Sequence, residues 1–332
     1  MVRVNTLRLM RYRKAARLRD AISEIGYGMW GMGGWSGSED AESARALDRA
    51  VELGCTFFDT AAAYGEGHSE RLLGDLLRRY RDLKLVAASK VAPKNRQWPG
   101  RATSAADDVF PYDHIIESTH ATLRHLGVDT IDLQQLHVWD DSWTDADGWR
   151  RAITELKQAG KIRAFGISIN RWEPSNVLRA LRTGLVDAVQ VVYNVFDQSA
   201  EDVLFPACER EGIAVIARVP FDEGSLTGTL RADSRWPEGD WRNIYFSPAH
   251  LAETLPRVDA VRRDAEALGL PLPELALRFI LSHPAVTTTI PGMRRPRHVE
   301  ANLGVSDKPP LAVEALTRLR AHRWNRVPDD RP

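Results

Sequence analysis

The sequence has few cysteines, no excess of charge of either sign and no long apolar run. Its 332 residues include only two cysteines, Cys55 and Cys208, which are too few for a disulfide framework. Both flank apolar stretches, so we expect them to be buried free thiols. The 45 basic side chains equal the 45 acidic ones, which argues against a nucleic-acid or acidic-membrane partner.

Targeting and membrane signals are also missing. No stretch is apolar enough to span a bilayer. The arginine-rich beginning, from Arg8 to Arg19, lacks the apolar region of a secretory signal. Together with the low cysteine content, these absences predict a soluble protein of a reducing cytoplasm, with a small-molecule partner.

Metal-binding patterns are not found either, although the acidic loop at residues 140–148 has a suggestive composition. When Gly148 takes the sixth position of an EF-hand loop, Trp143 falls at the first position and Thr154 at the twelfth, where carboxylates are needed. An aspartate of this loop is better explained as the cap of the next helix. The histidines lack the close paired spacing of zinc sites, so we predict no metal.

What the sequence does contain is a regular alternation of apolar runs and amphipathic segments. Strands are expected at residues 22–29, 56–59, 84–90, 131–137, 162–168, 187–192, 213–218 and 286–290. Helices are expected at residues 40–53, 69–80, 112–126, 146–159, 174–182, 200–210, 250–268, 273–282, 296–303 and 311–322. This alternation is typical of a parallel sheet with helices outside it, and eight such units predict a single (β/α)8 TIM barrel over residues 1–332.

Polar side chains stand where three of these strands end. Asp59 ends one apolar run, and Tyr64 follows it across a loop of small residues. Lys90 ends the next strand, and His137 ends the one after that. Each residue alone has an ordinary explanation, as a cap, a salt bridge or a packed ring. Their occurrence together at the end of a parallel barrel where catalysis is usually placed favours an active site.

The ordered set resembles the aldo-keto reductase family. That family has an FDTA-type strand end with a tyrosine five residues on, then a strand ending in lysine, then a strand ending in Leu-His. The resemblance extends from about Ile25 to Asn302. It implies a barrel whose bottom is closed by a short hairpin, formed by the segment up to Asp20, and an NADPH-dependent reduction of an aldehyde or ketone.

The family resemblance also implies the catalytic roles. Tyr64 would donate a proton to the carbonyl oxygen, and Lys90 would ease its release because an ammonium favours the phenolate. Asp59 would pair with Lys90 and fix its position. His137 would orient the carbonyl and stabilise the developing charge. No side chain carries a hydride, so a cofactor must supply it.

The expected cofactor site is not a Rossmann fold, because no Gly-x-Gly-x-x-Gly follows the first strand. The resemblance instead implies an extended NADP⁺ or NADPH across the barrel top. Its contacts would be Gly31, Met32, Ser168, Asn170, Gln190, Arg218, Pro220, Gly224, Leu226, Gly228, Gly292, Arg294, His298 and Asn302.

Several of these residues have particular expected roles. Ser168, Asn170 and Gln190 would hold the carboxamide, although Ile169 separates the first two here. Arg218 stands where an aromatic side chain commonly stacks on the nicotinamide; its charge should disfavour the oxidised ring and push the reaction toward reduction. The segment from Asp222 to Gly228 would face the pyrophosphate.

The far end of the cofactor would lie at a helix N-terminus. Arg294 would bind the 2′-phosphate there, which favours NADPH over NADH. His298 and Ala301 replace the usual glutamine and glutamate, while Asn302 is retained. We therefore expect weaker adenine contacts than the family typically makes.

Two long loops, residues 92–110 after the third strand and 222–248 after the seventh, leave the same barrel end. Tryptophans in such loops predict the walls of an apolar pocket, although packing on neighbouring helices would explain about half of them. We expect Trp30, Trp98 and Trp139 to contact the substrate. A polar mouth lined by tryptophan suits a sugar- or polyol-like carbonyl compound, including a nucleotide-linked keto-sugar.

Two other functions stay open. One is a sugar dehydrogenase that works in the oxidative direction. The other is a cofactor-sensing regulatory subunit, because some proteins of this fold serve as channel partners. The sequence leaves the natural substrate, the pathway and the oligomeric state undetermined.

Overall fold

The structure is a computed structural model that describes residues 10–34 and 39–326. Arg8 and Trp35 lie outside the described residues. The first described elements are two short strands, β1 (Tyr12–Arg13) and β2 (Ile22–Ser23), which pair antiparallel as a hairpin. A hairpin was expected from the segment up to Asp20, and the structure extends it by one strand beyond that residue.

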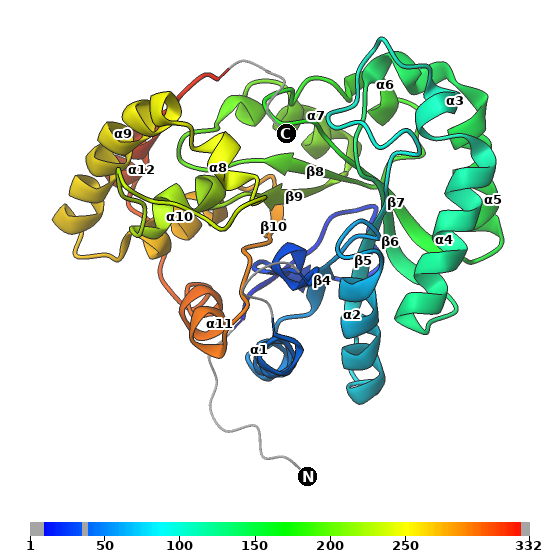
Figure 1. The fold of residues 1–332 in the computed structure, drawn as a ribbon, viewed down its shortest axis with the longest axis horizontal. Helices are drawn as coiled ribbons and strands as arrows, with labels where there is room; N and C mark the ends of the chain where they lie inside the picture. The colour runs from blue at the N-terminus through cyan, green and yellow to red at the C-terminus, as the bar shows by residue number, and fades with distance from the viewer. Residues whose placement is uncertain (1–9, 35–38, 327–332) are drawn as a thin grey trace.

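A barrel of parallel strands forms the centre of the molecule (Figure 1). Its strands are β3 (Tyr27–Gly28), β4 (Phe57–Asp59), β5 (Val86–Val91), β6 (Ile131–Leu136), β7 (Ile162–Ser168), β8 (Ala188–Val192), β9 (Ala214–Arg218) and β10 (Val286–Thr289). Each strand pairs with the next along the chain. Parallel bridges from Ile25 to Thr289 and from Gly28 to Gly292 bring β3 beside β10 and close the sheet. The predicted (β/α)8 barrel is therefore confirmed.

The first predicted strand, residues 22–29, was wrong as one unit. Its beginning, Ile22–Ser23, is the second strand of the hairpin and pairs with β1, whereas Tyr27 and Gly28 pair with β4. Gly26 lies between the two parts, and a Cβ there would come within 2.8 Å of the Phe57 ring. The segment therefore has two different partners, and close packing at Gly26 separates them.

Helices cover the outside of the barrel (Figure 1). The longer ones are α1 (Asp40–Glu52), α2 (His68–Arg79), α4 (Tyr112–Leu126), α5 (Asp147–Gln158), α7 (Leu204–Glu211), α9 (Pro248–Ala267), α10 (Leu272–Leu281), α11 (Pro296–Leu303) and α12 (Val313–Arg320). All nine were expected, to within a few residues. Their apolar faces pack on the strands, as in α2, where Leu73 and Leu76 are fully buried.

The short elements were predicted less well. The helix expected at residues 174–182 is only α6 (Leu178–Leu181), because Val177 before it has an extended φ of −159°. Two short helices, α3 (Ala106–Val109) and α8 (Arg242–Tyr245), lie in the long loops and were not predicted. The 3-10 segments are η1 (Trp30–Met32), η2 (Asp141–Asp145), η3 (Ser199–Glu201) and η4 (Asp222–Thr227).

The barrel interior contains an apolar plug below a polar layer. Phe57, Ala88 and Leu133 belong to one buried cluster, which the hairpin side covers with Leu18. Side chains two residues apart on a strand point to the same face. The residues two positions further on, which are Asp59, Lys90 and Gln135, therefore point into the barrel above the plug, toward its carboxyl end.

Three further observations concern the cysteines, membrane spans and metal ligands. Cys55 and Cys208 are buried free thiols, as predicted, and burial raises the pKa of each to about 12. Within residues 10–34 and 39–326, no helix is both long and apolar enough to cross a membrane. In the same part of the chain, His, Cys, Asp and Glu side chains form no group of three that would hold a metal ion.

Candidate active site

A buried ion pair lies at the centre of the candidate site. Lys90 is completely buried, and its Nζ donates to Asp59 Oδ1 at 2.5 Å and to the carbonyl oxygen of Thr60 at 2.7 Å. The second oxygen of Asp59 accepts from Gln190 Nε2 at 2.8 Å and from Gln135 Nε2 at 3.2 Å. Both charges are thus paired and hydrogen-bonded, which is the condition for keeping an ion pair inside a protein.

Tyr64 lies above this pair, on the loop between β4 and α2. Lys90 Nζ is 5.1 Å from the centre of its ring. Burial raises the pKa of Tyr64, and the positive charge of Lys90 works against that rise. The loop comes close to η1 through Gly65, where a Cβ would lie only 2.1 Å from the carbonyl oxygen of Gly33, and where φ is +65°. Only glycine satisfies both requirements at that position.

His137, just after β6, completes the group. Its ring centre lies 5.7 Å from that of Tyr64, and the ring of Trp98 stands perpendicular to it at 4.5 Å. Burial lowers the pKa of His137 well below its usual value, and the charges of Lys90 and Arg218 lower it further. Its Nδ1 is buried without a hydrogen-bond partner in the part of the chain that the structure describes. The imidazole is therefore neutral near pH 7.

The four residues proposed as catalytic thus come together at the carboxyl end of β4, β5 and β6. Gln135 belongs to this group as well, although the sequence analysis did not select it. Its signal was available, because Gln135 follows Leu133 by two residues within the predicted strand at residues 131–137 and so points to the same face as that inward residue. An inward-facing glutamine in a barrel needs a polar partner, and Asp59 supplies it.

Two of the three residues expected to bind the nicotinamide carboxamide already form hydrogen bonds within the protein. Gln190 uses its amide nitrogen on Asp59. Asn170 is tied to the backbone of Gly100: its Nδ2 donates to the carbonyl oxygen at 2.9 Å, and its Oδ1 accepts from the amide at 3.2 Å. Asn170 Nδ2 also donates to Glu173 Oε2 at 2.8 Å. Its amide group therefore holds the loop of residues 92–110, while Ser168 stands buried at the end of β7.

Arg218 points into the barrel mouth at the end of β9. Its Nη2 donates to the carbonyl oxygen of Ile169 at 3.1 Å, and its Nε is buried with no partner among residues 10–34 and 39–326. Burial and the neighbouring charge of Arg171 lower the pKa of Arg218 to about 10. The side chain still carries its charge at neutral pH, close to the group formed by Tyr64 and His137.

The residues expected at the pyrophosphate share one strained loop. This loop, residues 219–228, contains Pro220, Gly224, Leu226 and Gly228. Its φ values are positive at Val219 (58°), Asp222 (45°), Glu223 (56°), Gly224 (106°) and Gly228 (81°). A Cβ on either glycine would meet nothing within 4 Å, so the loop surface is open at these points. Open backbone of this kind is suited to approach by an anion.

Arg294, expected at the 2′-phosphate, lies in a cluster of arginines before α11. Burial lowers the pKa of Arg294, and the charges of Arg242 and Arg295 lower it further. A Cβ on Gly31 would lie 2.8 Å from Arg294 Cδ, so the glycine lets this side chain fold against η1, where Met32 is buried. Arg242 of α8 was not foreseen, because nothing in the sequence connects its loop with α11. A concentration of guanidinium groups fits a phosphate dianion.

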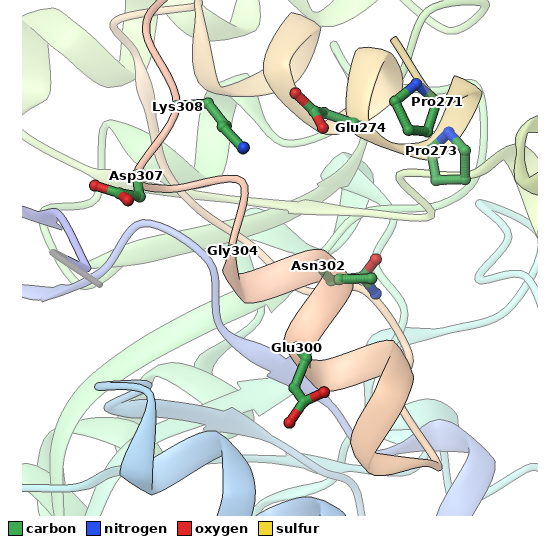
Figure 2. Close-up of a pocket in the computed structure, with 9 residues that line it drawn as sticks. Pro271, Pro273, Glu274, Glu300, Asn302, Gly304, Asp307 and Lys308 are labelled. Atoms are coloured by element: carbon green, nitrogen blue, oxygen red, sulfur yellow. The ribbon is translucent and has the colours of Figure 1, made fainter. Parts of the chain in front are cut away.

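The residues expected at the adenine end are not brought into one pocket. Asn302 lines a hollow of about 360 Å³ between α10 and α11, beside Glu300 (Figure 2). The other residues around it are Pro271, Pro273, Glu274, Ala301, Gly304, Asp307 and Lys308. Arg294 and His298 do not line this hollow. His298 is exposed, and Arg297 Nε lies 3.4 Å from its Nε2. Gly292 is exposed at the start of the same segment.

The tryptophans divide into two groups. Trp98 and Trp30 are 41% and 43% exposed, and Trp30 stands edge-on to Trp241 at 6.4 Å. Trp139 is completely buried against Trp143 and Trp149, with ring centres 5.9 and 5.2 Å away. The expectation that Trp139 contacts the substrate was therefore wrong, because its ring packs in the core. Trp98 and Trp30 remain as candidate walls of the mouth.

Comparisons with known proteins agree with this geometry. The model of the Aldo/keto reductase family matches residues 24–323. A curated relative, the aldo-keto reductase YhdN of Bacillus subtilis, is 31% identical over 88% of this chain and 87% of its own length. The solved structure of the glycerol dehydrogenase AKR11B4 from Gluconobacter oxydans is 27% identical with a TM-score of 0.76, covering 96% of this chain and 97% of that one.

A second solved structure carries a cofactor. It is an aldo-keto reductase from Klebsiella pneumoniae in complex with NADPH, which is 25% identical with a TM-score of 0.68. The match covers 93% of this chain and 94% of that chain.

Proposed function

The chain belongs to the aldo/keto reductase family, whose members are NAD(P)H-dependent oxidoreductases of carbonyl and alcohol groups, and we propose that it reduces an aldehyde or ketone with NADPH. The observation that carries the proposal is that Tyr64 and His137 lie beside the buried pair of Asp59 and Lys90 at one end of the barrel. The arginine cluster at Arg294 supports the choice of a 2′-phosphorylated cofactor.

The reaction needs one hydride and one proton. The hydride would come from a nicotinamide cofactor, when bound, and would go to the carbonyl carbon. Tyr64 gives its phenolic proton to the carbonyl oxygen, and the phenolate that remains is stabilised by the ammonium of Lys90 nearby. Asp59 keeps that ammonium charged and in place. Proton transfer from a positioned acid contributes roughly 10²- to 10⁴-fold to such a rate.

His137 orients the substrate. A neutral imidazole has one N–H donor, which can bind the carbonyl oxygen beside Tyr64. Because the low pKa of His137 keeps this ring uncharged, it does not compete with Tyr64 as an acid. Trp98 stands against the histidine ring and forms one wall of the mouth, which excludes water from that side.

The substrate class follows from the side chains at the open end of the barrel, where Trp30 and Trp98 are exposed. Exposed tryptophan faces suit the C–H surface of a polyhydroxylated compound, and the relative from Gluconobacter oxydans is named a glycerol dehydrogenase. We therefore propose a sugar- or polyol-derived carbonyl compound as the substrate. The same name supports the oxidative direction as the second candidate, since the same groups act in reverse by microscopic reversibility.

The decisive experiment replaces Tyr64 by phenylalanine. Wild-type protein should oxidise NADPH in the presence of small hydroxy-aldehydes or ketones, and Tyr64→Phe should turn over about 10²- to 10⁴-fold more slowly. NADPH binding, followed by quenching of tryptophan fluorescence, should be preserved. Full turnover by the variant would contradict the assigned acid, and a protein that binds NADPH but turns over no carbonyl or alcohol would favour a cofactor sensor.

A further inference from the structure

We infer that Arg326 is a positioning residue for the cofactor's pyrophosphate. Its ion pair with Asp222 fixes the loop of residues 219–228 and places a positive charge beside the Asp222 carboxylate. The inference rests on the proposed function, because it assumes that this loop faces the pyrophosphate. It concerns a residue more than 20 positions beyond the last element of the expected cofactor site.

The loop needs something to hold it. Val219, Asp222 and Glu223 all have positive φ values, of 58°, 45° and 56°. Such conformations are unfavourable for residues with a Cβ, most of all for a β-branched valine. They persist only where surrounding contacts fix the backbone. The contacts around Asp222 therefore decide whether the loop keeps this shape.

Arg326 supplies those contacts from the C-terminal segment. Its side chain is only 4% exposed, and its Nη2 lies 2.8 Å from Asp222 Oδ1. Its Nε donates to Asp197 Oδ1 at 3.1 Å, Nη2 also binds Asp197 Oδ2, and Nη1 donates to the Tyr245 hydroxyl at 3.0 Å. The guanidinium lies 5.0 Å from the centre of the Trp172 ring. One side chain thus joins the loops after β8 and β9 with the segment around α8.

The network continues to both ends of the strained segment. Asp197 accepts from Asn194 Nδ2 at 3.0 Å, and the same nitrogen donates to the carbonyl oxygen of Val219 at 3.1 Å. On the other side, Ser225 Oγ donates to Asp222 Oδ2 at 2.8 Å. Burial by itself would raise the pKa of Asp222, but Arg326 outweighs that effect and holds it below the usual value. The carboxylate is therefore charged and depends on Arg326.

The charges of the loop explain why the pairing of Asp222 with Arg326 matters for binding a cofactor. The loop carries two adjacent carboxylates, Asp222 and Glu223, and would by itself repel a pyrophosphate. Each is paired with an arginine from another element: Asp222 with Arg326, and Glu223 with Arg171 at 2.5 Å. The exposed backbone amides can then attract the anion, because each carboxylate of the loop has a guanidinium beside it. Without Arg326, a buried and uncompensated carboxylate would remain behind the anion site.

The test compares Arg326→Gln with Arg323→Gln. Arg323 lies on the same segment and pairs with Asp202 at 2.5 and 2.7 Å on the surface, so its loss removes the same charge without touching the loop. Binding of NADPH, NADH and adenosine 2′,5′-bisphosphate is measured by tryptophan fluorescence, with circular dichroism as the check of folding. Adenosine 2′,5′-bisphosphate contains the 2′-phosphate but not the pyrophosphate.

We expect Arg326→Gln to weaken NADPH and NADH by the same factor, at least about tenfold, which corresponds to one charge-assisted contact. Adenosine 2′,5′-bisphosphate keeps only the adenosine-side phosphate of the pyrophosphate, so its binding should weaken by a smaller factor. Arg323→Gln should change none of the three affinities. Arg326→Gln leaves both Asp222 and Asp197 without their arginine. Adding Asp222→Asn removes the uncompensated charge of the loop itself and should recover part of the lost affinity. Failure of this recovery, or equal weakening of all three ligands, would overturn the inference.

Two outcomes separate this inference from the proposed function. If wild type binds NADPH and Arg326→Gln binds it equally well, only the inference fails. If wild type binds neither NADPH nor NADH, the proposed function itself fails. Should Arg326→Gln not fold, Arg326→Lys decides the question: it retains the charge but not the forked donor, and unchanged NADPH affinity in that variant would contradict the positioning role.

Discussion

The ammonium of Lys90 lies 2.5 Å from the carboxylate of Asp59, and their side chains are 0% and 3% exposed. A pair buried so completely is costly to assemble, and it adds little stability compared with an apolar pair. Such an arrangement is better explained by the chemistry that it makes possible at Tyr64, which lies directly above it. The first prediction follows from this relationship.

Lys90→Met should lower both activity and stability. Without the ammonium, the raised pKa of Tyr64 rises further, so the phenolate left after proton transfer is no longer stabilised and turnover falls about 10²-fold or more. The isolated charge of Asp59 should cost about 3–5 kcal/mol of unfolding free energy. Steady-state kinetics and urea denaturation measure the two effects.

A double variant separates the effect of Lys90→Met on turnover from its effect on stability. Asp59→Asn combined with Lys90→Met removes both charges of the pair and leaves neither one isolated, so it should recover most of the lost stability and none of the turnover. Arg78→Met is the matched control, because its ion pair with Asp75 lies on the surface and should contribute less than about 1 kcal/mol. Recovery of turnover in the double variant would contradict the role given to Lys90.

His137 should make the unfolding free energy depend on pH. Its pKa in the folded protein lies well below the ordinary 6.5, so the unfolded chain takes up a proton below that value while the folded protein does not. Stability therefore falls as pH falls below 6.5, by up to about 1.4 kcal/mol per pH unit from this residue. In His137→Gln that contribution is absent, so the variant should lose less stability between about pH 6.5 and about pH 5.5.

Urea denaturation of both proteins at the two pH values measures the difference. Other titrating groups, including the partly buried His283, are present in both proteins and cancel in the comparison. Identical losses in wild type and variant would mean that His137 is protonated in the native site, in conflict with a neutral carbonyl-binding imidazole.

The strands and their inward residues were predictable because they repeat a local pattern. Each of these strands is an apolar run that a polar residue ends, and side chains along a strand alternate between its two faces. The sequence alone therefore places Asp59, Lys90 and His137 at one end of the barrel. The same logic extends to Gln135, which this alternation places inside the barrel and Asp59 satisfies.

The loops were not predictable in the same way. Asn170 bonds to Gly100 and Arg326 bonds to Asp222, and each pair is brought together by the closed barrel rather than by any spacing in the chain. Trp139 shows the same limit, because nothing in its sequence context distinguishes a buried ring from a pocket wall. Loop residues that resemble a ligand contact can instead have an internal partner, and only the three-dimensional arrangement decides between them.

Asn170 gives a third prediction. Its two bonds to Gly100 hold the loop that carries Trp98 over His137, so Asn170→Ala should raise the KM for the carbonyl substrate. NADPH affinity should change little, because the amide is already used within the protein. Loss of these bonds and of the bond to Glu173 should lower the unfolding free energy by about 1–3 kcal/mol.

Ser168→Ala is the comparison for Asn170→Ala. Ser168 is the last residue of β7, two positions before Asn170, and remains our candidate for the carboxamide. Its loss should weaken NADPH more than it affects the KM of the carbonyl compound. If Asn170→Ala weakened NADPH as strongly as Ser168→Ala does, Asn170 would contact the cofactor, and its bonds to Gly100 would have to break on binding.

Arg294 should decide between the two nicotinamide cofactors. Arg242 and Arg295 lie beside Arg294, where Asp240 and Glu42 pair with them, and NADPH differs from NADH only by the 2′-phosphate placed there. Arg294→Ala should weaken NADPH about 10- to 100-fold, as the loss of a charge-assisted contact predicts, and leave NADH nearly unchanged. Arg318→Ala, which removes a positive charge from α12 beside Asp264, is the control and should affect neither cofactor. Titration by tryptophan fluorescence measures all four affinities. Equal weakening of NADPH and NADH by Arg294→Ala would move the 2′-phosphate away from this residue and toward another member of the arginine cluster.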